Sequence, residues 1–409
     1  MTRPGYKMTE IGEIPQKWEY IKIGDTKVVE KMKAGGTPLK SVKEYYENGM
    51  IPFVKIEDMV NSSKYLATTQ EFITEDGLNH SSSWLTPIDS ILFSMYASYG
   101  EVSINKIPVA TNQAIISIVP KKENVDVTFL YYELKNLKSS LKQYLRSTTQ
   151  SNLNAEIVRG LKIVLPPLPE QQKIAEILTT ADQNIELINQ EIQAAEKLKK
   201  GLMQTLLTKG IWHTKYKKTE IGEIPEEWSI SNFGTSFIKN NIKVGKIKES
   251  QIKSIGKFPV VDQSKRIISG YTDNEDLVYS GEMPLILFGD HTLVFKYIDF
   301  KFVAGADGTK LLIPNKNIFY PKFLFYVLLS RNIKSEGYKR HYSKLKMIAF
   351  QIPPILEQQK IAEILSTADN KIELLKNKKE RLEKLKKGLM NDLLTGQVRV
   401  KIDSSRGEN

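Results

Sequence analysis

The chain has no cysteine and only four histidines among its 409 residues. The lack of cysteine excludes a disulfide framework, thiol nucleophiles and zinc sites of the cysteine type, and it fits a reducing compartment. The histidines, His80, His213, His291 and His341, are too scattered along the sequence to indicate a metal site. A site made only of carboxylates stays open, but no pattern identifies one.

Long hydrophobic runs are also missing, because no stretch reaches 18 consecutive apolar residues. The first residues, MTRPGYKMTEIGEIP, lack the apolar core of a signal peptide. The composition, with 41% hydrophobic and 9% aromatic residues, is typical of a globular protein of two to four domains. We therefore expect a soluble, cytoplasmic protein.

The usual catalytic motifs are absent as well. The sequence contains no G-x-x-x-x-G-K-[ST] phosphate loop, no G-x-S-x-G nucleophile elbow and no H-E-x-x-H helix. Residues 288–292 (FGDHT) hold an Asp-His pair that we interpret as structural or as a contact site. The glycine-rich residues 34–38 (AGGTP) and 304–308 (AGADG) are more typical of turns than of phosphate-binding loops. We predict a chain that is not catalytic by itself, with no catalytic residue and no cofactor of its own.

Two segments of the chain occur twice. Residues 6–18 (YKMTEIGEIPQKW) return as residues 216–228 (YKKTEIGEIPEEW), with 10 of 13 positions identical. Residues 166–188 return as residues 353–375, with 17 of 23 identical, and both copies contain the string EQQKIAEIL. The period near two hundred residues is far longer than a solenoid repeat, so each unit is a domain followed by a helix. The sequence between the two repeated segments is 23 residues longer in the first copy.

The second repeated segment opens a long amphipathic helix in each copy. Apolar residues follow alternating steps of four and three, which is the pattern of a coiled-coil heptad seam. The seam positions are Ile174, Leu178, Ala181, Ile185, Ile188, Ile192, Ala195, Leu202 and Leu206 in the first copy, and Ile361, Leu365, Ala368, Ile372, Leu375, Leu382, Leu389 and Leu393 in the second. Lysines interrupt the seam at Lys199, Lys379 and Lys386. Because neither helix can bury its seam alone, we predict that the two helices pair with each other; packing of each on its own domain is the alternative.

The first repeated segment, residues 6–18 or 216–228, is called the box below. The region between the box and the long helix of each copy is predicted to be an α/β domain. Short β-type runs at residues 51–56, 90–95 and 114–119, and at 258–261, 285–288 and 310–313, are each followed by a helical stretch, 127–144 or 321–333. The predicted boundaries are 1–165 for the first domain, 166–209 for the central helix, 210–351 for the second domain, 352–395 for the C-terminal helix and 396–409 for a flexible tail. The fold class is α/β (α+β), with two globular domains separated by two long antiparallel coiled-coil helices in pseudo-two-fold symmetry.

The net charge of +12 lies mainly in the domains. Residues 170–209 have a net charge of −1 and residues 357–395 have +2, so the helices hold little of the excess. A polar, basic turn precedes each long helix, at residues 146–154 (RSTTQSNLN) and 338–346 (YKRHYSKLK). Arg pairs with guanine and Gln or Asn with adenine, while Ser, Thr and Lys suit phosphates. The two turns therefore indicate nucleic-acid binding with different sequence preferences, although a solvated loop is the alternative for any single residue.

The duplicated T-E-I-G-E-I-P-x-x-W boxes and P-P-x-x-E-Q-Q-K-I-A-E-I-L helix starts resemble the specificity subunit (HsdS) of type I restriction-modification systems. The resemblance covers essentially residues 6 to 395. It implies that each domain is a target recognition domain reading one half of a bipartite, asymmetric double-stranded DNA site, and that the helices fix the gap. It also implies two methyltransferase (modification) subunits docked on this chain and restriction subunits with translocase activity. S-adenosylmethionine, ATP and Mg are expected on those partner subunits.

Segments 34–38, 111–113 (TNQ), 288–292 and 305–308 resemble the recognition-domain patterns of this family, and the turn at 148–152 resembles it in position. The candidate DNA-binding residues are Lys33, Thr37, Lys40, Asn112, Gln113, Arg146, Thr148, Thr149, Gln150 and Asn152 in the first domain, and Lys265, Arg266, His291, Thr292, Lys339, Arg340, His341, Tyr342 and Lys344 in the second. The alternative function is a basic RNA-binding or protein-assembly scaffold without base readout; a nuclease acting alone is a weaker one.

Overall fold

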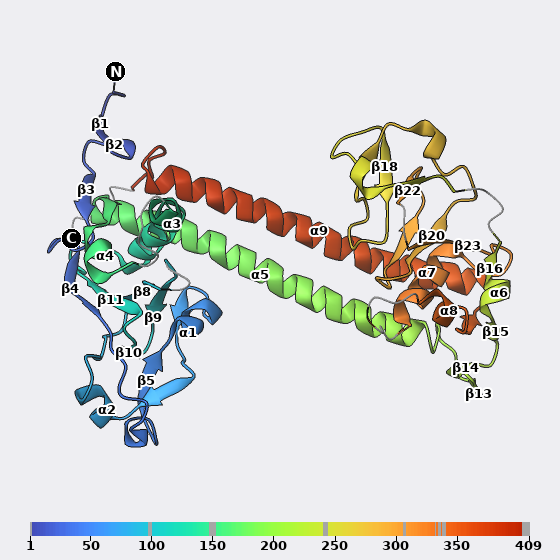
Figure 1. Cartoon of the computed structure of the whole chain (residues 1–409), viewed down its shortest axis with the longest axis horizontal. Helices are drawn as coiled ribbons and strands as arrows, with labels where there is room; N and C mark the ends of the chain where they lie inside the picture. The colour runs from blue at the N-terminus through green and yellow to red at the C-terminus, as the bar shows by residue number, and fades with distance from the viewer. Residues whose placement is uncertain are drawn as a thin grey trace. The chain divides into compact units, whose positions relative to one another are not determined.

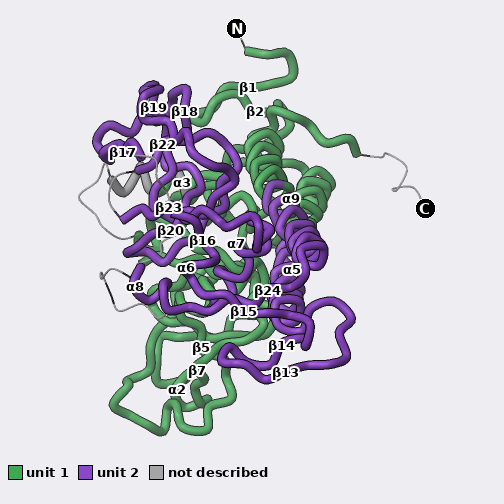
Figure 2. The backbone as a smooth tube through the Cα atoms, turned by 90° about the vertical axis from the view of Figure 1, so that its right-hand side faces the viewer, with its two compact units in different colours: residues 1–188, 378–409 green, residues 189–377 purple. Residues whose placement is uncertain are grey.

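The computed structural model describes residues 2–96, 100–146, 153–239, 244–305, 308–331, 333, 337 and 341–402, without the side chains of 139–140 and 142–146. The chain divides into two compact units (Figure 2). Unit 1 comprises Met1–Ile188 and Lys378–Asn409, and unit 2 comprises Asn189–Asn377. Each unit therefore contains one box, one α/β domain and parts of two long helices.

The two long helices are α5 (Leu168–Leu206) and α9 (Ile355–Leu394), close to the predicted 166–209 and 352–395 (Figure 1). In unit 1, Ile174 and Leu178 near the start of α5 share a core with Leu393 and Leu394 at the end of α9. In unit 2 the start of α9 packs with the end of α5 in the same way. Within each unit the helices are thus antiparallel and share a core, as predicted. That core also contains residues of the domain, such as Phe129 in unit 1 and Phe323 in unit 2, so the helix ends pack on their own domain as well. Among the described residues, no helix is both long enough and apolar enough to span a membrane.

The domain of unit 1 is built on a five-stranded sheet of order β4-β11-β8-β9-β6 and a three-stranded sheet of order β10-β5-β7. A short continuous apolar run produces a strand such as β8 (ILFS), whose four residues are all buried. The strands are β4 (Val29–Ala34), β5 (Ile51–Val54), β6 (Tyr65–Leu66), β7 (Glu71–Ile73), β8 (Ile91–Ser94), β9 (Val102–Asn105), β10 (Ala110–Thr111) and β11 (Ile115–Pro120). The helices are α1 (Ile56–Asn61), α2 (Glu75–Asn79), α3 (Val127–Arg146) and α4 (Ala155–Gly160).

The domain of unit 2 repeats this topology with a four-stranded sheet, β16-β23-β20-β21, and a second sheet of order β17-β22-β18-β19. Its strands are β16 (Phe237–Ile238), β17 (Lys246–Ile247), β18 (Phe258–Val261), β19 (Gly270–Thr272), β20 (Leu285–Gly289), β21 (Phe295–Ile298), β22 (Val303–Gly305) and β23 (Thr309–Pro314). Its helices are α6 (Phe233–Ser236), α7 (Pro321–Ser330) and α8 (Tyr342–Leu345), and short 3-10 turns occur at Lys43–Tyr45, Glu249–Gln251 and Glu275–Leu277. The string Ile-Leu-Phe is common to β8 and β20, so these strands are equivalent.

Each repeated box forms a β-hairpin and ends in a tryptophan that docks on a long helix. The hairpins are β1 (Tyr6–Thr9) with β2 (Gly12–Pro15), and β13 (Tyr216–Thr219) with β14 (Gly222–Pro225). The chain then pairs β3 (Glu19–Lys22) with β12 (Lys162–Leu165), and β15 (Ser229–Ser231) with β24 (Phe350–Ile352). The indole nitrogen of Trp18 donates to Glu170 at 3.0 Å, and that of Trp228 donates to Glu357 at 2.9 Å. The repeated box and the repeated helix start are therefore one structural joint.

The first glutamine of each EQQ string ties the helix start to its domain. Gln171 is fully buried; its amide nitrogen donates to the carbonyl oxygens of Asn124 and Pro166, both at 2.8 Å. Gln358 makes the same contacts in unit 2, donating to Ile318 and Pro353 at 2.9 Å. Because an unsatisfied buried polar group is costly, these bonds fix the position of each domain on its helix.

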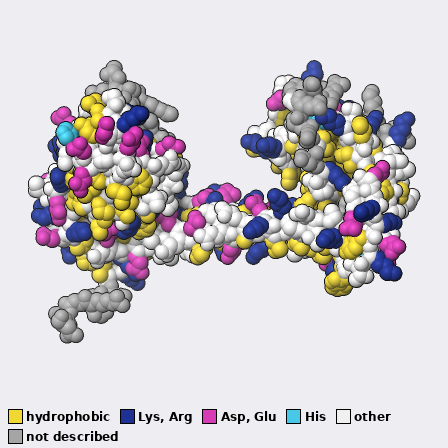
Figure 3. All heavy atoms as spheres, turned by 90° about the horizontal axis from the view of Figure 1, so that it is seen from below, with side chains coloured by type: hydrophobic (Ala, Val, Ile, Leu, Met, Phe, Trp, Pro, Cys, Tyr) yellow, Lys and Arg dark blue, Asp and Glu magenta, His cyan; other side chains and the backbone are white. Residues whose placement is uncertain are grey.

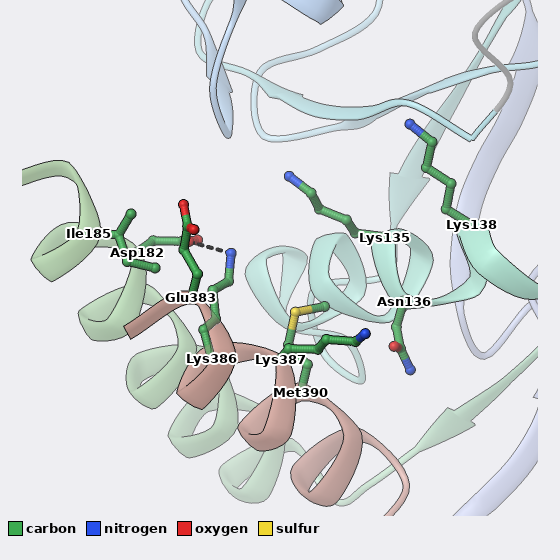
Figure 4. A pocket seen from close by; sticks show the side chains of 9 residues that line it. All are labelled: Lys135, Asn136, Lys138, Asp182, Ile185, Glu383, Lys386, Lys387 and Met390. Atoms are coloured by element: carbon green, nitrogen blue, oxygen red, sulfur yellow. Dashed lines mark ion pairs between the residues drawn. The ribbon is translucent and has the colours of Figure 1, made fainter. Parts of the chain in front are cut away.

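A second joint links a domain tyrosine to both helices of the same unit. Tyr132 of α3 donates to Asp182 of α5 at 2.6 Å, and Asp182 pairs with Lys386 of α9. Figure 4 shows Lys386 directed at Asp182, beside a cavity of about 580 Å³. Unit 2 repeats the joint, because Tyr326 donates to Asp369 at 2.7 Å and Asp369 pairs with Lys199 at 2.5 Å. All three lysines that interrupt the predicted seam are thus ion-paired, since Lys379 lies 3.7 Å from Glu383 of its own helix.

The start of the predicted flexible tail, residues 396–402, makes specific contacts within unit 1. Gly396 ends α9 with a φ of +71°, and the Tyr6 hydroxyl donates to its carbonyl oxygen at 3.0 Å. Arg399 Nε then donates to Glu170 at 2.9 Å. The equivalent segment after α5 behaves alike, with Ile211 N and His213 Nε2 meeting Glu357 at 2.8 and 2.9 Å. Charge pairing with a buried carboxylate orders this stretch, and residues 403–409 lie outside the described residues.

Candidate nucleic-acid interface

In unit 1, two of the predicted recognition segments lie side by side. The Gly36 amide donates to the Thr111 carbonyl oxygen at 2.9 Å, and the Thr37 hydroxyl donates to Gln113 Oε1 at 2.5 Å. A Cβ on Gly35 would lie 2.0 Å from the Thr111 oxygen, so only glycine permits this approach. Thr37 and Gln113 therefore form one surface feature, although they are 76 residues apart.

The remaining described candidates of unit 1 lie beside this feature or on its strands. Lys33, on β4, and Lys40 are exposed, and Asn112 is half-buried with its Oδ1 accepting from Ala114 N at 3.1 Å. The side chain of Asn112 therefore also shapes its own turn. Trp84 also lies here, although we did not predict it. Its indole N–H donates to the Lys33 carbonyl oxygen at 3.4 Å, and the Nζ of Lys31 lies 4.2 Å from its ring centroid.

In unit 2, the segment 288–292 and Gly308 also come together. The Asp290 amide donates to the Gly308 carbonyl at 2.7 Å, and the Thr292 hydroxyl donates to the Gln263 carbonyl at 2.7 Å. Gln263 Oε1 accepts from the His291 amide at 3.3 Å. Gln263 joins the segments that carry the candidates, and the sequence reading missed it. Its only signal was its place between a buried strand and the basic pair Lys265 and Arg266.

In the Asp-His pair of residues 288–292, Asp290 has a structural role. Asp290 is buried, and its Oδ1 accepts from the backbone amides of His341 and Tyr342, both at 2.7 Å. The carboxylate therefore holds the start of α8, inside the segment predicted as a basic turn, next to the end of β20. Asp290 belongs to the framework of the interface, in line with the structural interpretation.

His341 was predicted to contact DNA, but the structure places its side chain in the core. It is fully buried, and its Nδ1 lies 3.0 Å from the Asp290 carbonyl oxygen. The His341 amide also donates to the Asp290 carbonyl oxygen at 3.1 Å. In unit 1 the Leu153 amide makes the corresponding bond to the Met95 carbonyl oxygen, also at 3.1 Å. His341 thus occupies the position of a buried leucine, so a direct contact through its ring is incompatible with this conformation.

The neighbouring candidates of unit 2 differ in exposure. Tyr342 and Lys344 are half-buried, while Thr292, Lys265 and Arg266 are exposed and His291 is partly exposed. Burial raises the pKa of the Tyr342 hydroxyl, and the nearby Asp290 adds to this effect. Tyr342 therefore stays neutral and can serve as a hydrogen-bond donor or as an aromatic surface.

Several predicted residues lie outside the described part of the chain. These are Thr148, Thr149, Gln150, Asn152, Lys339 and Arg340, and for Arg146 only the backbone, at the end of α3, is described. The roles of these residues stay predictions.

Charge is distributed unevenly between domains and helices. The helix surface carries Lys/Arg and Asp/Glu side chains interspersed (Figure 3). Pairs such as Lys360 with Glu363 and Lys376 with Glu196 join opposite charges at 2.9 and 2.6 Å. Such a mixed surface does not attract a polyanion, so phosphate contacts are left to the domains. Among the described residues, no group of three His, Asp or Glu side chains could hold a metal ion.

Comparison with known proteins agrees with this geometry. The family model for the type I restriction modification DNA specificity domain matches residues 15–197 and 225–384. The type I restriction enzyme MjaVIII specificity subunit of Methanocaldococcus jannaschii is 30% identical over 418 residues, covering 95% of this chain and 94% of that protein. The crystal structure of a type I restriction-modification system S subunit from M. genitalium covers 98% of this chain and 100% of its own, with a TM-score of 0.59 and 19% identity, and so supports the fold. The chain therefore belongs to the type I restriction-modification specificity subunit family.

Proposed function

We propose that this chain reads a bipartite, asymmetric site in double-stranded DNA, with one half-site read by each α/β domain. The observation that carries the proposal is the contrast between conserved joints and divergent surfaces inside one chain. Trp18 and Trp228 make the same joint contact, whereas the segments at the candidate interfaces share position but not chemistry. A shared scaffold with different surface residues is what reading two different sequences requires.

The chemistry of the two candidate surfaces supports base readout in addition to phosphate binding. Gln113 in unit 1 is an exposed amide, which suits adenine, whereas Arg266 in unit 2 is an exposed guanidinium, which suits guanine. Phosphate binding alone would need only positive charge. The alternative of an RNA-binding or assembly scaffold without base readout has no comparable observation in its favour.

We further propose that the partner subunits bind the helices. Leu198 and Leu385 are 62% and 57% exposed, and they occupy equivalent positions of α5 and α9. In unit 2, Leu198 lines a groove of about 420 Å³ together with Leu202 and Ala368. Exposed leucines repeated in both copies suit two copies of one partner, such as a modification subunit presenting an apolar helix face. In this proposal the partners, and not this chain, hold S-adenosylmethionine, ATP and Mg and carry out catalysis.

The proposal is tested by purifying the tagged chain from its host and using the recovered complex to select sites from random duplex DNA. We expect a methyltransferase subunit to co-purify and a split site with two unlike halves to be enriched. Specific and unrelated duplexes are then compared across salt concentrations, because phosphate contacts weaken with salt for every sequence whereas base contacts keep a specificity ratio. Recovery of RNA, or binding without any enriched duplex, would support the scaffold alternative instead.

A further inference from the structure

Lys296, on β21, is a buried lysine whose ammonium group contacts a single loop. Its side chain is 3% exposed. Nζ donates to the carbonyl oxygen of Asp262 at 2.7 Å and to that of Arg266, and it lies 3.8 Å from Asp262 Oδ1. All of these acceptors belong to residues 262–269, the loop that follows β18. The ammonium group therefore ties the start of this loop to its middle.

Burying the charged side chain of a lysine costs free energy of folding, which compensating contacts must offset. Burial lowers the pKa of the Lys296 ammonium group, while the Asp262 charge opposes this effect. A buried charge is tolerated when it is paired and hydrogen-bonded. The pairing of β21 with β20 uses backbone groups and does not need this side chain. The loop contacts are therefore what distinguishes lysine from an apolar residue here.

The loop held by Lys296 carries exposed basic side chains. Lys265 and Arg266 are exposed, and Arg266 is the residue whose carbonyl accepts from Lys296. The base of the loop is fixed by the Ser269 amide, which donates to Val260 at 2.9 Å, and by Gln263, which accepts from Thr292 at 2.7 Å. With its backbone held at three places, the loop presents the Arg266 side chain from a defined position next to residues 289–292.

The equivalent position in unit 1 is different. Lys296 pairs with Leu287 in the β20–β21 register, and Ser103 pairs with Leu92 in the β8–β9 register. Ser103 is buried, and its hydroxyl lies 3.2 Å from that of Ser62. The joint residues Trp, Glu and Gln are the same in both units, whereas this buried position under the loop is not. The buried position held by Lys296 or Ser103 therefore differs between the units, as the candidate surfaces do, whereas the joint residues are the same.

We propose that Lys296 is a positioning residue for DNA reading by the second domain, acting through the loop 262–269 to place Arg266 on the bases of one half-site. The inference rests on the proposed function of the chain. Lys296 itself does not touch DNA; it sets the geometry of a residue that does. Pre-organisation of this kind matters because a bidentate contact with a base requires a defined position of the side chain.

The test is selection of sites from random duplex DNA with the full chain and its co-purified partners, comparing wild type, K296M, R266A and the double variant. We expect K296M to lower base discrimination in one half-site by about tenfold and to leave the other half-site unchanged. R266A should affect the same base pairs, and the double variant should add little, since both changes remove one contact. S103A, at the same register position of unit 1, is the matched control and should leave both half-sites as in wild type.

The outcomes separate the inference from the function on which it rests. An asymmetric site that K296M reads as well as wild type would overturn the role of Lys296 and leave the proposed function intact. Additive effects of K296M and R266A would also overturn it, because they would mean that Lys296 acts elsewhere. Absence of any enriched site for wild type would instead contradict the proposed function. If circular dichroism shows K296M to be unfolded, K296Q, which keeps a donor on a shorter side chain, is judged by the same criteria.

Discussion

At the scale of single residues, Glu133 shows how the two units differ inside the same scaffold. It lies on α3 beside Tyr132, and the equivalent residue beside Tyr326 is Val327. Its Oε1 accepts from the Val164 amide at 3.1 Å, and its Oε2 has no hydrogen-bond partner in the described part of the chain. Burial raises its pKa from 4.5 to about 7, and the bond from Val164 opposes this only partly. Glu133 is therefore a destabilising group at neutral pH.

Replacement of Glu133 by glutamine should change the pH dependence of stability. The pKa of Glu133 is higher in the folded chain than in the unfolded chain, so folding is coupled to binding of a proton. The contribution of Glu133 to the free energy of unfolding therefore falls as the pH rises from about 4.5 to about 7. Across this window the free energy of unfolding of E133Q should rise relative to that of wild type, by up to about 3 kcal/mol. Urea unfolding at pH 5 and pH 8 measures the effect. The exposed Glu123 provides the control E123Q, and equal pH profiles for E133Q and wild type would contradict the account.

His341 and Gln263 mark what the sequence does not predict about single residues. The basic residues around His341 indicate a solvated turn, and nothing local reveals that its ring takes the place of a leucine. That placement depends on Asp290, 51 residues earlier in the chain. Gln263 likewise acquires its role through contacts with residues 291 and 292. Residue types at a site are predictable from sequence, but burial set by long-range contacts is not.

At the scale of elements, periodicity predicts most of the fold. Residues 258–261 form β18 as predicted, the predicted helix 127–144 is α3 (Val127–Arg146), and 321–333 contains α7 (Pro321–Ser330). The α3 segment has helical spacing of apolar residues, and α7 and β18 are short, nearly continuous apolar runs, so local preference and burial agree. The pairing of β3 with β12, and of β15 with β24, was not predicted, because strand partners distant in sequence leave no local pattern.

The ion pairs at the helix seam should contribute to helix pairing within each unit. Charge reversal in D182K should destabilise the chain, and D182K/K386D should restore part of the loss, with a coupling energy of about 0.5–3 kcal/mol. The restoration is partial because Tyr132 loses its acceptor. Urea unfolding of wild type, both single variants and the double variant gives the coupling.

Lys360 and Glu363 supply the matched control for this cycle. They form an exposed pair within one helix turn, so their reversal should change stability by no more than about 0.5 kcal/mol. A coupling between positions 182 and 386 as small as that of the control pair would show that the seam lysines do not determine helix pairing.

At the scale of the whole molecule, one chain contains two versions of the same unit. The sequence duplication predicts this, and the structure adds that the segment after each long helix docks on the box of a unit, through Tyr216 with His213 in unit 2 and Tyr6 with Gly396 in unit 1. The joint residues Trp18 and Trp228, with their acceptors Glu170 and Glu357, are common to both versions, whereas the candidate surfaces carry different residues. This contrast is what a constant assembly that reads two different half-sites requires.

The most direct test of this division of labour is site selection from random duplex DNA with two double variants, T37A/Q113A and K265A/R266A. The first removes the contact pair of unit 1, and the second removes the exposed basic pair of unit 2. We predict that each variant loses base preference in one half of the site, in opposite halves, with the gap between the halves unchanged. Loss of preference in both halves by either variant would contradict the claim that each domain reads its own half-site.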